Sequence, residues 1–337
     1  MNNFHSISII IPAYNASATL QQCIESVLKQ DLQNIEIIII DDGSYDNTLD
    51  IIKELAQKNK YISFATQKNE GANSARNLGW CLAKGEYIFF LDADDSIPEG
   101  ALSKMYTMAI QEHLDVLITA SNNICIGLYQ KIKLNAESSS PLDIIKYILE
   151  GQISCGPWGR LFRRSLYTPM AFSLSRAAFK NEDLFMNIAL LLQANKAKST
   201  NQIVGYNYTV GSGTSISRTK LSELGHQELV RKLKNTLDSG KNNRISNAEY
   251  YSYVYKTINA FFFSKGFLYK DKQFLNMLYL KTKGVQFNRR QIKFIRQCTH
   301  YNILAIAFII YQQTIRTLKF LSRKTKILIN KITIYQH

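Results

Sequence analysis

Residues 6 to about 100 alternate between short apolar runs and segments whose apolar residues recur at helical spacing. Continuous apolar runs bounded by polar turns are typical of strands buried on both faces, and spacings of three and four are typical of helices. The expected strands cover residues 6–13, 36–40, 61–65 and 87–91, and the expected helices cover 20–28, 49–55 and 70–84. This regular alternation predicts a parallel sheet with right-handed crossovers.

The next hundred or so residues are less regular. They contain expected strands at 114–120 and 203–210, an edge hairpin at 124–134, a helix at 141–149 and a helical stripe after Asp183. Residues 211–215 are Gly, Ser and Thr, which predicts a flexible connection. We therefore expect an α/β first domain over residues 1–215, with a mostly parallel sheet flanked by helices.

From about residue 219 the sequence has helical periodicity and few strand signals, which predicts a basic, mainly helical C-terminal region over residues 216–337. The formal net charge of the chain is +15, and Asp271 is the last acidic residue. Thirteen Lys and Arg follow it, interleaved with apolar runs such as residues 303–311. This mixture is typical of helices that lie on an anionic membrane surface. A helical bundle packed on the first domain, with solvated charges outside, is the alternative.

Cysteine, histidine and N-terminal residues narrow the class of protein further. Five cysteines form no CxxC pair and five histidines show no zinc spacing, so the sequence predicts a reducing compartment and no disulfide framework. The first residues lack a basic n-region, and no apolar stretch reaches the ~18 residues of a spanning helix. We expect a cytoplasmic protein.

Acidic residues follow two of the expected strands. Asp41 and Asp42 end the second strand, and Asp92, Asp94 and Asp95 follow the fourth. Because the carboxyl ends of parallel strands lie at the same edge of a sheet, these carboxylates are expected to converge. Mg²⁺ or Mn²⁺ would relieve their mutual repulsion, since hard cations prefer oxygen ligands. A solvated turn with a helix cap is the alternative.

The usual glycine-rich phosphate loops are absent. No GxGxxG follows the first strand, and the chain contains no GxxxxGK[ST] sequence. If the protein binds a nucleotide, a cation held by carboxylates would have to contact its phosphates.

Two further segments contain candidate functional residues. Trp158 is flanked by glycines and followed by Arg160, which suits a loop that stacks on a ring and meets anionic oxygens; a core tryptophan with solvated arginines is the alternative. Glu182 and Asp183 open a helical stripe, where the helix dipole stabilises anions. A carboxylate at this position could act as a base, or could simply cap the helix.

Four sequence blocks resemble glycosyltransferase family 2, whose fold is the GT-A type. They occur in the order and spacing of the family, at residues 8–15 (SIIIPAYN), 41–44 (DDGS), 71–79 (GANSARNLG) and 85–95 (GEYIFFLDADD). The resemblance covers roughly residues 6–215 and leaves the tail uncovered. It implies an inverting, metal-dependent, hexosyltransferase-like enzyme that uses a nucleotide-diphosphate sugar, commonly a UDP-sugar, and Mn²⁺ or Mg²⁺.

The resemblance also implies roles for individual residues. The donor would be bound by Pro12, Ala13 and Tyr14 around the base, by Asp41 on the base, and by Asp92, Asp94, Arg76, Trp158 and Arg160. Of the DxD-type cluster, Asp94 or Asp95 would be the metal ligand. Asp183 would be the catalytic base, with Glu182 beside it. Arg160 stands where many members carry lysine, and arginine also binds phosphate.

The leading interpretation is a transferase that builds a cell-surface polysaccharide on a glycan or lipid-linked acceptor, attached peripherally to the inner face of the cell membrane. A metal-dependent nucleotidyltransferase is an alternative, although residues 15–19 do not form the basic glycine-rich loop expected of one. A second alternative is a nucleic-acid-binding protein, because the chain is basic, but no recognition motif supports this interpretation. A catalytically inactive sugar-binding module is a third, and the intact acidic blocks argue against it.

Overall fold

The computed structural model describes residues 5–125, 128–175, 182–210 and 223–239. The chain divides into two compact units, residues 1–245 and 246–337. The expected connection at 211–215 and the predicted domain boundary beside it lie outside the described residues. Of the C-terminal region predicted for 216–337, only residues 223–239 are described, and they form a helix as expected.

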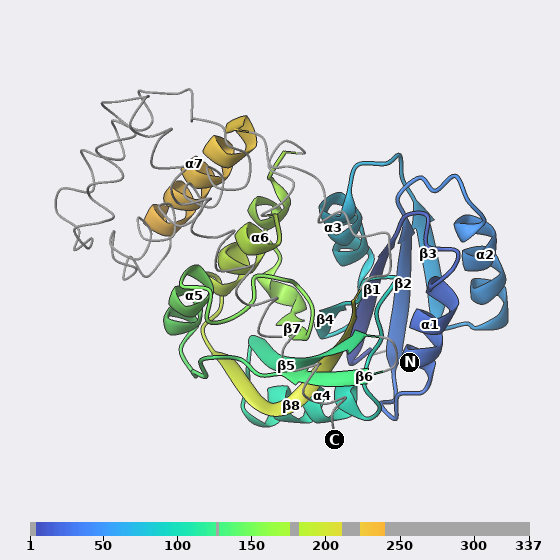
Figure 1. Cartoon of the computed structure of the whole chain (residues 1–337), viewed down its shortest axis with the longest axis horizontal. Helices are drawn as coiled ribbons and strands as arrows, with labels where there is room; N and C mark the ends of the chain where they lie inside the picture. Colours follow the sequence, from blue (N-terminus) through green and yellow to red (C-terminus); the bar gives the residue numbers. More distant parts are fainter. Residues whose placement is uncertain (1–4, 126–127, 176–181, 211–222, 240–337) are drawn as a thin grey trace, which may run out of the picture. The chain divides into compact units, whose positions relative to one another are not determined.

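The described part of the chain forms one eight-stranded sheet with helices against it (Figure 1). The strand order is β3-β2-β1-β4-β7-β5-β6, and β8 also pairs with β5. The strands are β1 (Ile7–Ala13), β2 (Ile35–Asp41), β3 (Ile62–Thr66), β4 (Tyr87–Phe90), β5 (Val116–Cys125), β6 (Leu128–Ile132), β7 (Arg160–Arg163) and β8 (Ala197–Thr209). The helices are α1 (Leu20–Leu28), α2 (Thr48–Lys58), α3 (Ala72–Leu82), α4 (Ala101–Gln111), α5 (Pro141–Leu149), α6 (Glu182–Leu191) and α7 (Glu223–Ser239).

The first four strands are parallel to one another and confirm the βαβ prediction. β1 lies between β2 and β4, and its isoleucines are almost completely buried, as expected of a central strand covered on both faces. The pairing ends with Ala13 opposite Asp41. The turns after β1, β2 and β4 therefore lie at one edge of the sheet, beside the point where the strand order reverses and α/β proteins bind ligands.

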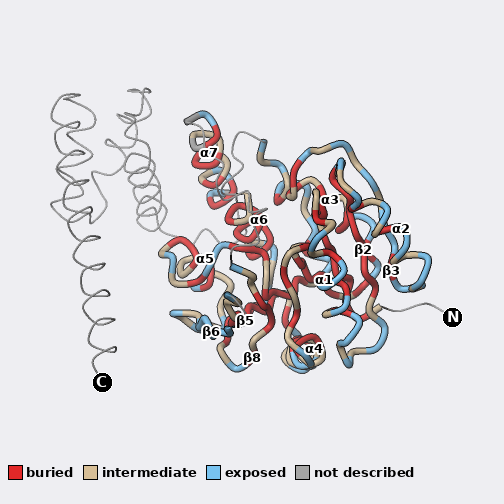
Figure 2. The backbone as a smooth tube through the Cα atoms, turned by 45° about the vertical axis from the view of Figure 1, so that its right-hand side comes forward, coloured by how far each residue is buried: buried red, intermediate tan, exposed pale blue. Residues whose placement is uncertain are grey.

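The second half of the sheet differs from the expectation in three respects. β7 is antiparallel to both β4 and β5 and lies between them, whereas the sequence placed this segment in a loop. β5 extends to Cys125, and β8 starts at Ala197, before the expected residue 203. The expected edge hairpin is present, since β5 pairs with β6, whose five residues are all exposed (Figure 2).

The two faces of the sheet have separate cores. One core packs β1, β2 and β4 against α1 and α4. On the other face α3 approaches β1 so closely that a Cβ at Gly79 would lie 2.3 Å from Cγ2 of Ile10. Glycine is required there because a methyl group has no space. This close contact holds α3, and with it Arg76, against the sheet.

α6 is buried from Leu184 to Leu191 and packs against α5 and α7. No helix in the described part of the chain is long and apolar enough to cross a membrane.

Candidate active site

The carboxylates that follow β4 form an acidic cluster of Asp92, Asp94 and Asp95. One oxygen of Asp92, Oδ1, accepts a hydrogen bond from Arg76 Nη2 at 2.8 Å. The backbone N–H of Asp92 donates to the hydroxyl of Tyr206 in β8 at 3.1 Å. The cluster is therefore held between α3 on one side and β8 on the other.

Asp95 is the most enclosed member of the acidic cluster, with 4% of its surface exposed. Its Oδ2 accepts from the Tyr206 hydroxyl and its Oδ1 from the backbone N–H of Thr209, both at 2.7 Å. Burial, and then the charge of Asp92, raise the pKa of Asp95 to about 8. The raised pKa means that the ionised form of Asp95 is disfavoured beside the other carboxylates. A bound cation would relieve this repulsion.

The donor set fits a hard divalent cation, because it consists of carboxylate oxygens. Asp94, which lies between the other two members in sequence, is half-buried. No group of three or more His, Cys, Asp or Glu side chains in the described part of the chain is arranged to hold a metal alone. A cation held here would be bound by carboxylate oxygens of the acidic cluster.

Arg76 links the acidic cluster to the start of α6. Its side chain is 5% exposed, and Nη1 lies 2.9 Å from Oδ1 of Asp183 while Nη2 contacts Asp92. Burial opposes the charged guanidinium, but the ion pairs with Asp183 and Asp92 hold the pKa of Arg76 above its ordinary value. Because a guanidinium is planar and donates from a fixed fork, this contact sets the distance between the two carboxylates.

Glu182 and Asp183 lie in the first turn of α6, where the helix dipole favours anions. Burial raises the pKa of Asp183, although Arg76 opposes the shift. Burial and the neighbouring Asp183 raise the pKa of Glu182 to about 8. The side chain of Asp183 is one-third exposed, so a substrate can reach it. A carboxylate with a raised pKa that stays accessible is suited to accept a proton.

Trp158 packs against two aromatic residues of β8, one of which, Tyr206, contacts the acidic cluster. Its ring stacks on Tyr206, with centroids 5.9 Å apart and planes at 29°, and lies 5.9 Å from the ring of Tyr208. A Cβ at Gly156 would lie 2.2 Å from the Trp158 ring, so glycine makes room for this position. Trp158 is half-buried, so part of its side chain remains accessible.

Arg160 has a buried environment. It is 1% exposed, Nη1 donates to Oδ1 of Asn187 at 2.6 Å, and Nη2 donates to the carbonyl of Ser154. Burial lowers the pKa of Arg160 to about 10. These partners are protein groups, so the donor-binding role that the resemblance implies for Arg160 stays a prediction.

Asn187 is a site-supporting residue that the sequence analysis missed. Its amide donates to the carbonyls of Cys155 and Asp183, at 2.9 and 2.7 Å, while its oxygen accepts from Arg160. It therefore ties the Trp158 loop to the turn that carries Asp183. An amide in the otherwise apolar stretch from Leu184 to Leu191 was the available signal, because a buried polar side chain needs partners.

The turn after β1 brings the predicted base-binding residues together. Ala13 pairs with Asp41, which is buried and whose carboxylate accepts weakly from the Ser44 N–H at 3.3 Å. Tyr14 is 39% exposed and meets the ring of Tyr45 edge-on, at 6.0 Å between centroids. Pro12 precedes them at the end of the β1–β2 pairing. The result is an exposed aromatic corner beside a buried carboxylate.

Asp42 fixes the loop that leads into α3. Its oxygens accept from the backbone N–H groups of Glu70 and Gly71, both at 2.8 Å, and from the amide of Gln67 at 2.7 Å. Asp42 thereby positions the helix that carries Arg76, a supporting role that the sequence analysis did not assign.

Comparisons with known proteins identify the family. The model of the family described as "Glycosyl transferase family 2" matches residues 8–168. WfaP of Escherichia coli, named a UDP-Glc:alpha-D-GlcNAc-diphosphoundecaprenol beta-1,3-glucosyltransferase, is 32% identical over 234 residues, which cover 67% of this chain and 85% of WfaP. The chain belongs to glycosyltransferase family 2.

Other relatives match shorter parts of this family 2 chain. An uncharacterised glycosyltransferase of Haemophilus influenzae is 47% identical over 113 residues, or 33% of this chain and 45% of that protein. The chain spans 34–65% of the length of this protein and three further curated relatives.

A solved structure shows the same fold. S. aureus TarS 1–349 in complex with UDP-GlcNAc superposes with a TM-score of 0.68 at 21% identity, covering 92% of each chain. The predicted GT-A-type fold is therefore confirmed.

Proposed function

We propose that this family 2 glycosyltransferase moves a sugar from a UDP-sugar to a glycan or lipid-linked acceptor, with inversion at the anomeric carbon. The observation that supports it best is the chain of contacts from Asp92 through Arg76 to Asp183. It supports the proposal because a carboxylate cluster suited to a metal and a diphosphate is linked to an accessible carboxylate, Asp183, that could act as a base. The choice of donor class is supported by WfaP, which is named for UDP-Glc, and by the structure of TarS in complex with UDP-GlcNAc.

In this proposal the donor base lies in the corner of Tyr14 and Asp41, and its diphosphate reaches the acidic cluster. Mn²⁺ or Mg²⁺, held by Asp94 with Asp95 beside it, would offset the charge that develops on the diphosphate as it leaves. Asp92 is fixed by Arg76 and lies toward the ribose side of the donor. Trp158 would limit the space open to the sugar.

Asp183 carries out the proton transfer. It takes the proton of the acceptor hydroxyl as that oxygen attacks the anomeric carbon, and the bond from this carbon to the diphosphate breaks. The anomeric carbon gains oxocarbenium character, as in other glycosyl chemistry. Attack from the face opposite the leaving diphosphate inverts the centre in one displacement.

A screen of nucleotide sugars with Mn²⁺ tests the donor and the stereochemistry. A UDP-sugar at a hundredfold excess over its Kd is expected to raise the melting temperature by on the order of 5 °C or more, because ligand binding stabilises the folded state. The product made from an α-linked donor should carry a β-linkage, measured by NMR coupling constants. Retention of the α-configuration would refute inversion, and stabilisation by free nucleoside triphosphates alone would favour the nucleotidyltransferase alternative.

Membrane attachment through the basic tail is a further part of the proposal, and its support is the charge distribution of the sequence. Each Lys or Arg near an anionic surface contributes about 1 kcal/mol. We expect the full chain to sediment with vesicles that contain anionic lipid and to be released by salt. A variant with glutamine at Arg289, Arg290, Lys293 and Arg296 should sediment less. Equal sedimentation with neutral and anionic vesicles would contradict this expectation.

A further inference from the structure

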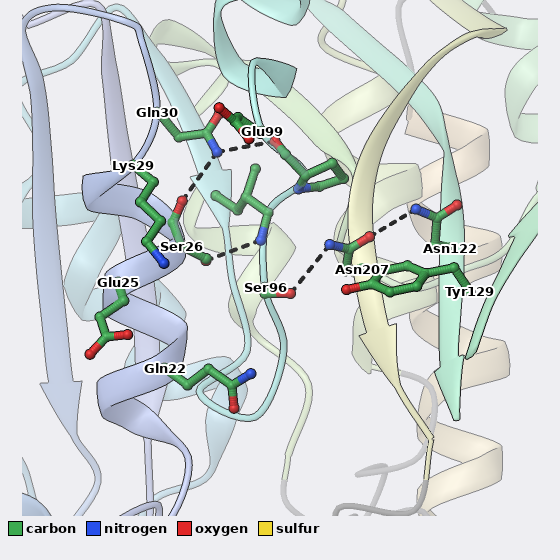
Figure 3. A pocket seen from close by; sticks show the side chains of 12 residues that line it. Gln22, Glu25, Ser26, Lys29, Gln30, Ser96, Glu99, Asn122, Tyr129 and Asn207 are labelled. Atoms are coloured by element: carbon green, nitrogen blue, oxygen red, sulfur yellow. Dashed lines mark hydrogen bonds between the residues drawn. The ribbon is translucent and has the colours of Figure 1, made fainter. Parts of the chain in front are cut away.

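A cavity of about 600 Å³ lies beside the active site, between α1, residues 96–99 and the ends of β5, β6 and β8 (Figure 3). Two of the residues that line it are sequence neighbours of residues in or against the acidic cluster. Ser96 follows Asp95 in sequence, and Asn207 lies between Tyr206 and Tyr208, which contact Asp95 and Trp158. The volume is within the roughly 300–1,000 Å³ of small-molecule sites.

The cavity and the acidic cluster are on different sides of β8. Successive side chains of a strand point to opposite faces, so the side chain of Asn207 is on the opposite face of β8 from those of Tyr206 and Tyr208. The contacts agree, because Asn207 bonds to Ser96 and Asn122, whereas Tyr206 bonds to Asp95. The cavity is thus a second recess that shares its walls with the active site.

Hydrogen bonds hold the walls of the cavity in place. Asn207 donates to the Ser96 hydroxyl at 3.3 Å and accepts from the Asn122 amide at 2.9 Å. Across the recess, the Gln30 amide donates to the carbonyls of Ser26 and Pro98, at 3.1 and 3.0 Å. Fixed walls of this kind keep the recess open without a ligand, which reduces the ordering that a ligand would have to impose.

Other side chains that line the cavity have polar groups available to hydrogen-bond a ligand. The side chains of Gln22, Lys29, Glu99 and Tyr129 make no hydrogen bond or ion pair with the residues that the structure describes. Gln22 and Tyr129 come from opposite sides of the recess, as Figure 3 shows. Tyr129 is 67% exposed, so its ring is accessible to a ligand in the recess.

The chemistry of the lining selects a class of ligand. Glu25 and Glu99 oppose a single ammonium, Lys29, so the recess is not suited to a phosphate or another anion. Its amides and hydroxyls both donate and accept, which matches the hydroxyl groups of a sugar. The face of the Tyr129 ring can pack against the apolar C–H face of a sugar ring. Ile97 and Pro98 are the aliphatic lining residues, too few for a lipid chain or an apolar helix.

We propose that this cavity is a glycan-binding subsite for the neutral sugar units of the acceptor chain. This inference rests on the proposed transfer to a glycan acceptor. The sugar units of the acceptor that follow the reacting unit would lie in the cavity. It assigns Tyr129 as the stacking platform and Gln22 as a hydrogen-bonding partner on the opposite wall.

The test measures glycan binding and donor binding separately, on the full chain. An array of neutral oligosaccharides of two to six hexose or N-acetylhexosamine units, with sulphated and sialylated oligosaccharides beside them, identifies a bound glycan for calorimetry. Tyr129→Ala should weaken its binding about tenfold, as expected for loss of an anchoring aromatic ring. Gln22→Ala should also weaken it, while Tyr129→Phe should bind within about threefold of the parent, because the ring face is retained.

Leu128→Ala is the matched control, because Leu128 is an exposed neighbour on the same strand and points to the other face. It should bind like the parent. Calorimetry with a UDP-sugar and Mn²⁺ should be unchanged in every variant, and Tyr129→Ala should raise the KM for an oligosaccharide acceptor but not for a monosaccharide acceptor.

Three results would overturn the inference: parental glycan affinity in both Tyr129→Ala and Gln22→Ala, preference for the acidic oligosaccharides, or binding of a UDP-sugar without binding of any neutral oligosaccharide. The last of these would leave the proposed transferase intact. Glycan binding that depends on Tyr129, in a chain that binds no nucleotide sugar, would instead support the subsite and refute the proposed donor.

Discussion

Asp183→Asn is expected to lower the rate of sugar transfer by about 10²–10⁴-fold, the usual cost of removing a general base. Asparagine keeps the shape of the side chain and its carbonyl oxygen can still accept from Arg76, so the site should remain assembled. Binding of UDP and Mn²⁺, measured by calorimetry, should stay close to the parental value. The expected signature is therefore a fall in kcat with donor affinity preserved.

The pH profile adds a second readout for Asp183. A base acts in its ionised form, so the parental rate should fall as the pH drops through the pKa of this carboxyl. Burial places that pKa above its ordinary value, and the fall should begin at a higher pH than an exposed aspartate would produce. Asp183→Asn removes the ionising group, and the residual activity should lose this acidic limb.

Glu182→Gln is the matched comparison for the adjacent carboxyl. With a pKa of about 8, Glu182 is mostly protonated near pH 7, and glutamine resembles this neutral form. We expect it to keep most of the parental activity. If Asp183→Asn transferred sugar at the parental rate and Glu182→Gln did not, the assignment of the base would be wrong.

The N-terminal half of the fold could be predicted because its information is local. Apolar runs such as 7–11 and 37–40 are long enough to identify buried strands, and alternation with helices then determines that they are parallel. The convergence of Asp41 with the acidic cluster at one sheet edge followed from this geometry alone. β7 was missed because Arg160 and Arg163 flank only two apolar residues, and its antiparallel insertion between β4 and β5 depends on contacts distant in sequence.

The supporting contacts of the site could not be read from local pattern for the same reason. Tyr206 reaches Asp95 across 111 residues of sequence, and Arg76 reaches Asp183 across 107. Nothing near either residue indicates its partner. Trp158 combines features of both interpretations offered by the sequence, a core side chain and a site residue. Its ring packs on Tyr206, yet the residue is only half-buried.

Asp94→Ala and an excess of chelator are both expected to remove most transfer activity, on the order of 10²–10³-fold, because a cation supplies several kcal/mol of transition-state stabilisation. Of the two carboxylates, Asp94 is a better test of metal binding than Asp95. Asp95→Ala should be as damaging to turnover, but it also leaves the Tyr206 hydroxyl and the Thr209 N–H without an acceptor, so part of its effect would be lost stability.

Tyr206→Phe separates these two effects, because it removes one hydrogen bond to Asp95 and leaves every carboxylate of the acidic cluster in place. It also removes the acceptor of the Asp92 backbone N–H, so it is expected to lower the melting temperature while retaining Mn²⁺-dependent transfer. Asp50→Ala, at a carboxylate 80% exposed on α2, controls for the loss of a negative charge and should leave transfer unchanged. The decisive measurement is Mn²⁺ binding in the presence of UDP, which Asp94→Ala should weaken in parallel with turnover. Full activity in excess chelator, with Asp94→Ala and Asp95→Ala near the parental rate, would show that the acidic cluster holds no catalytic metal.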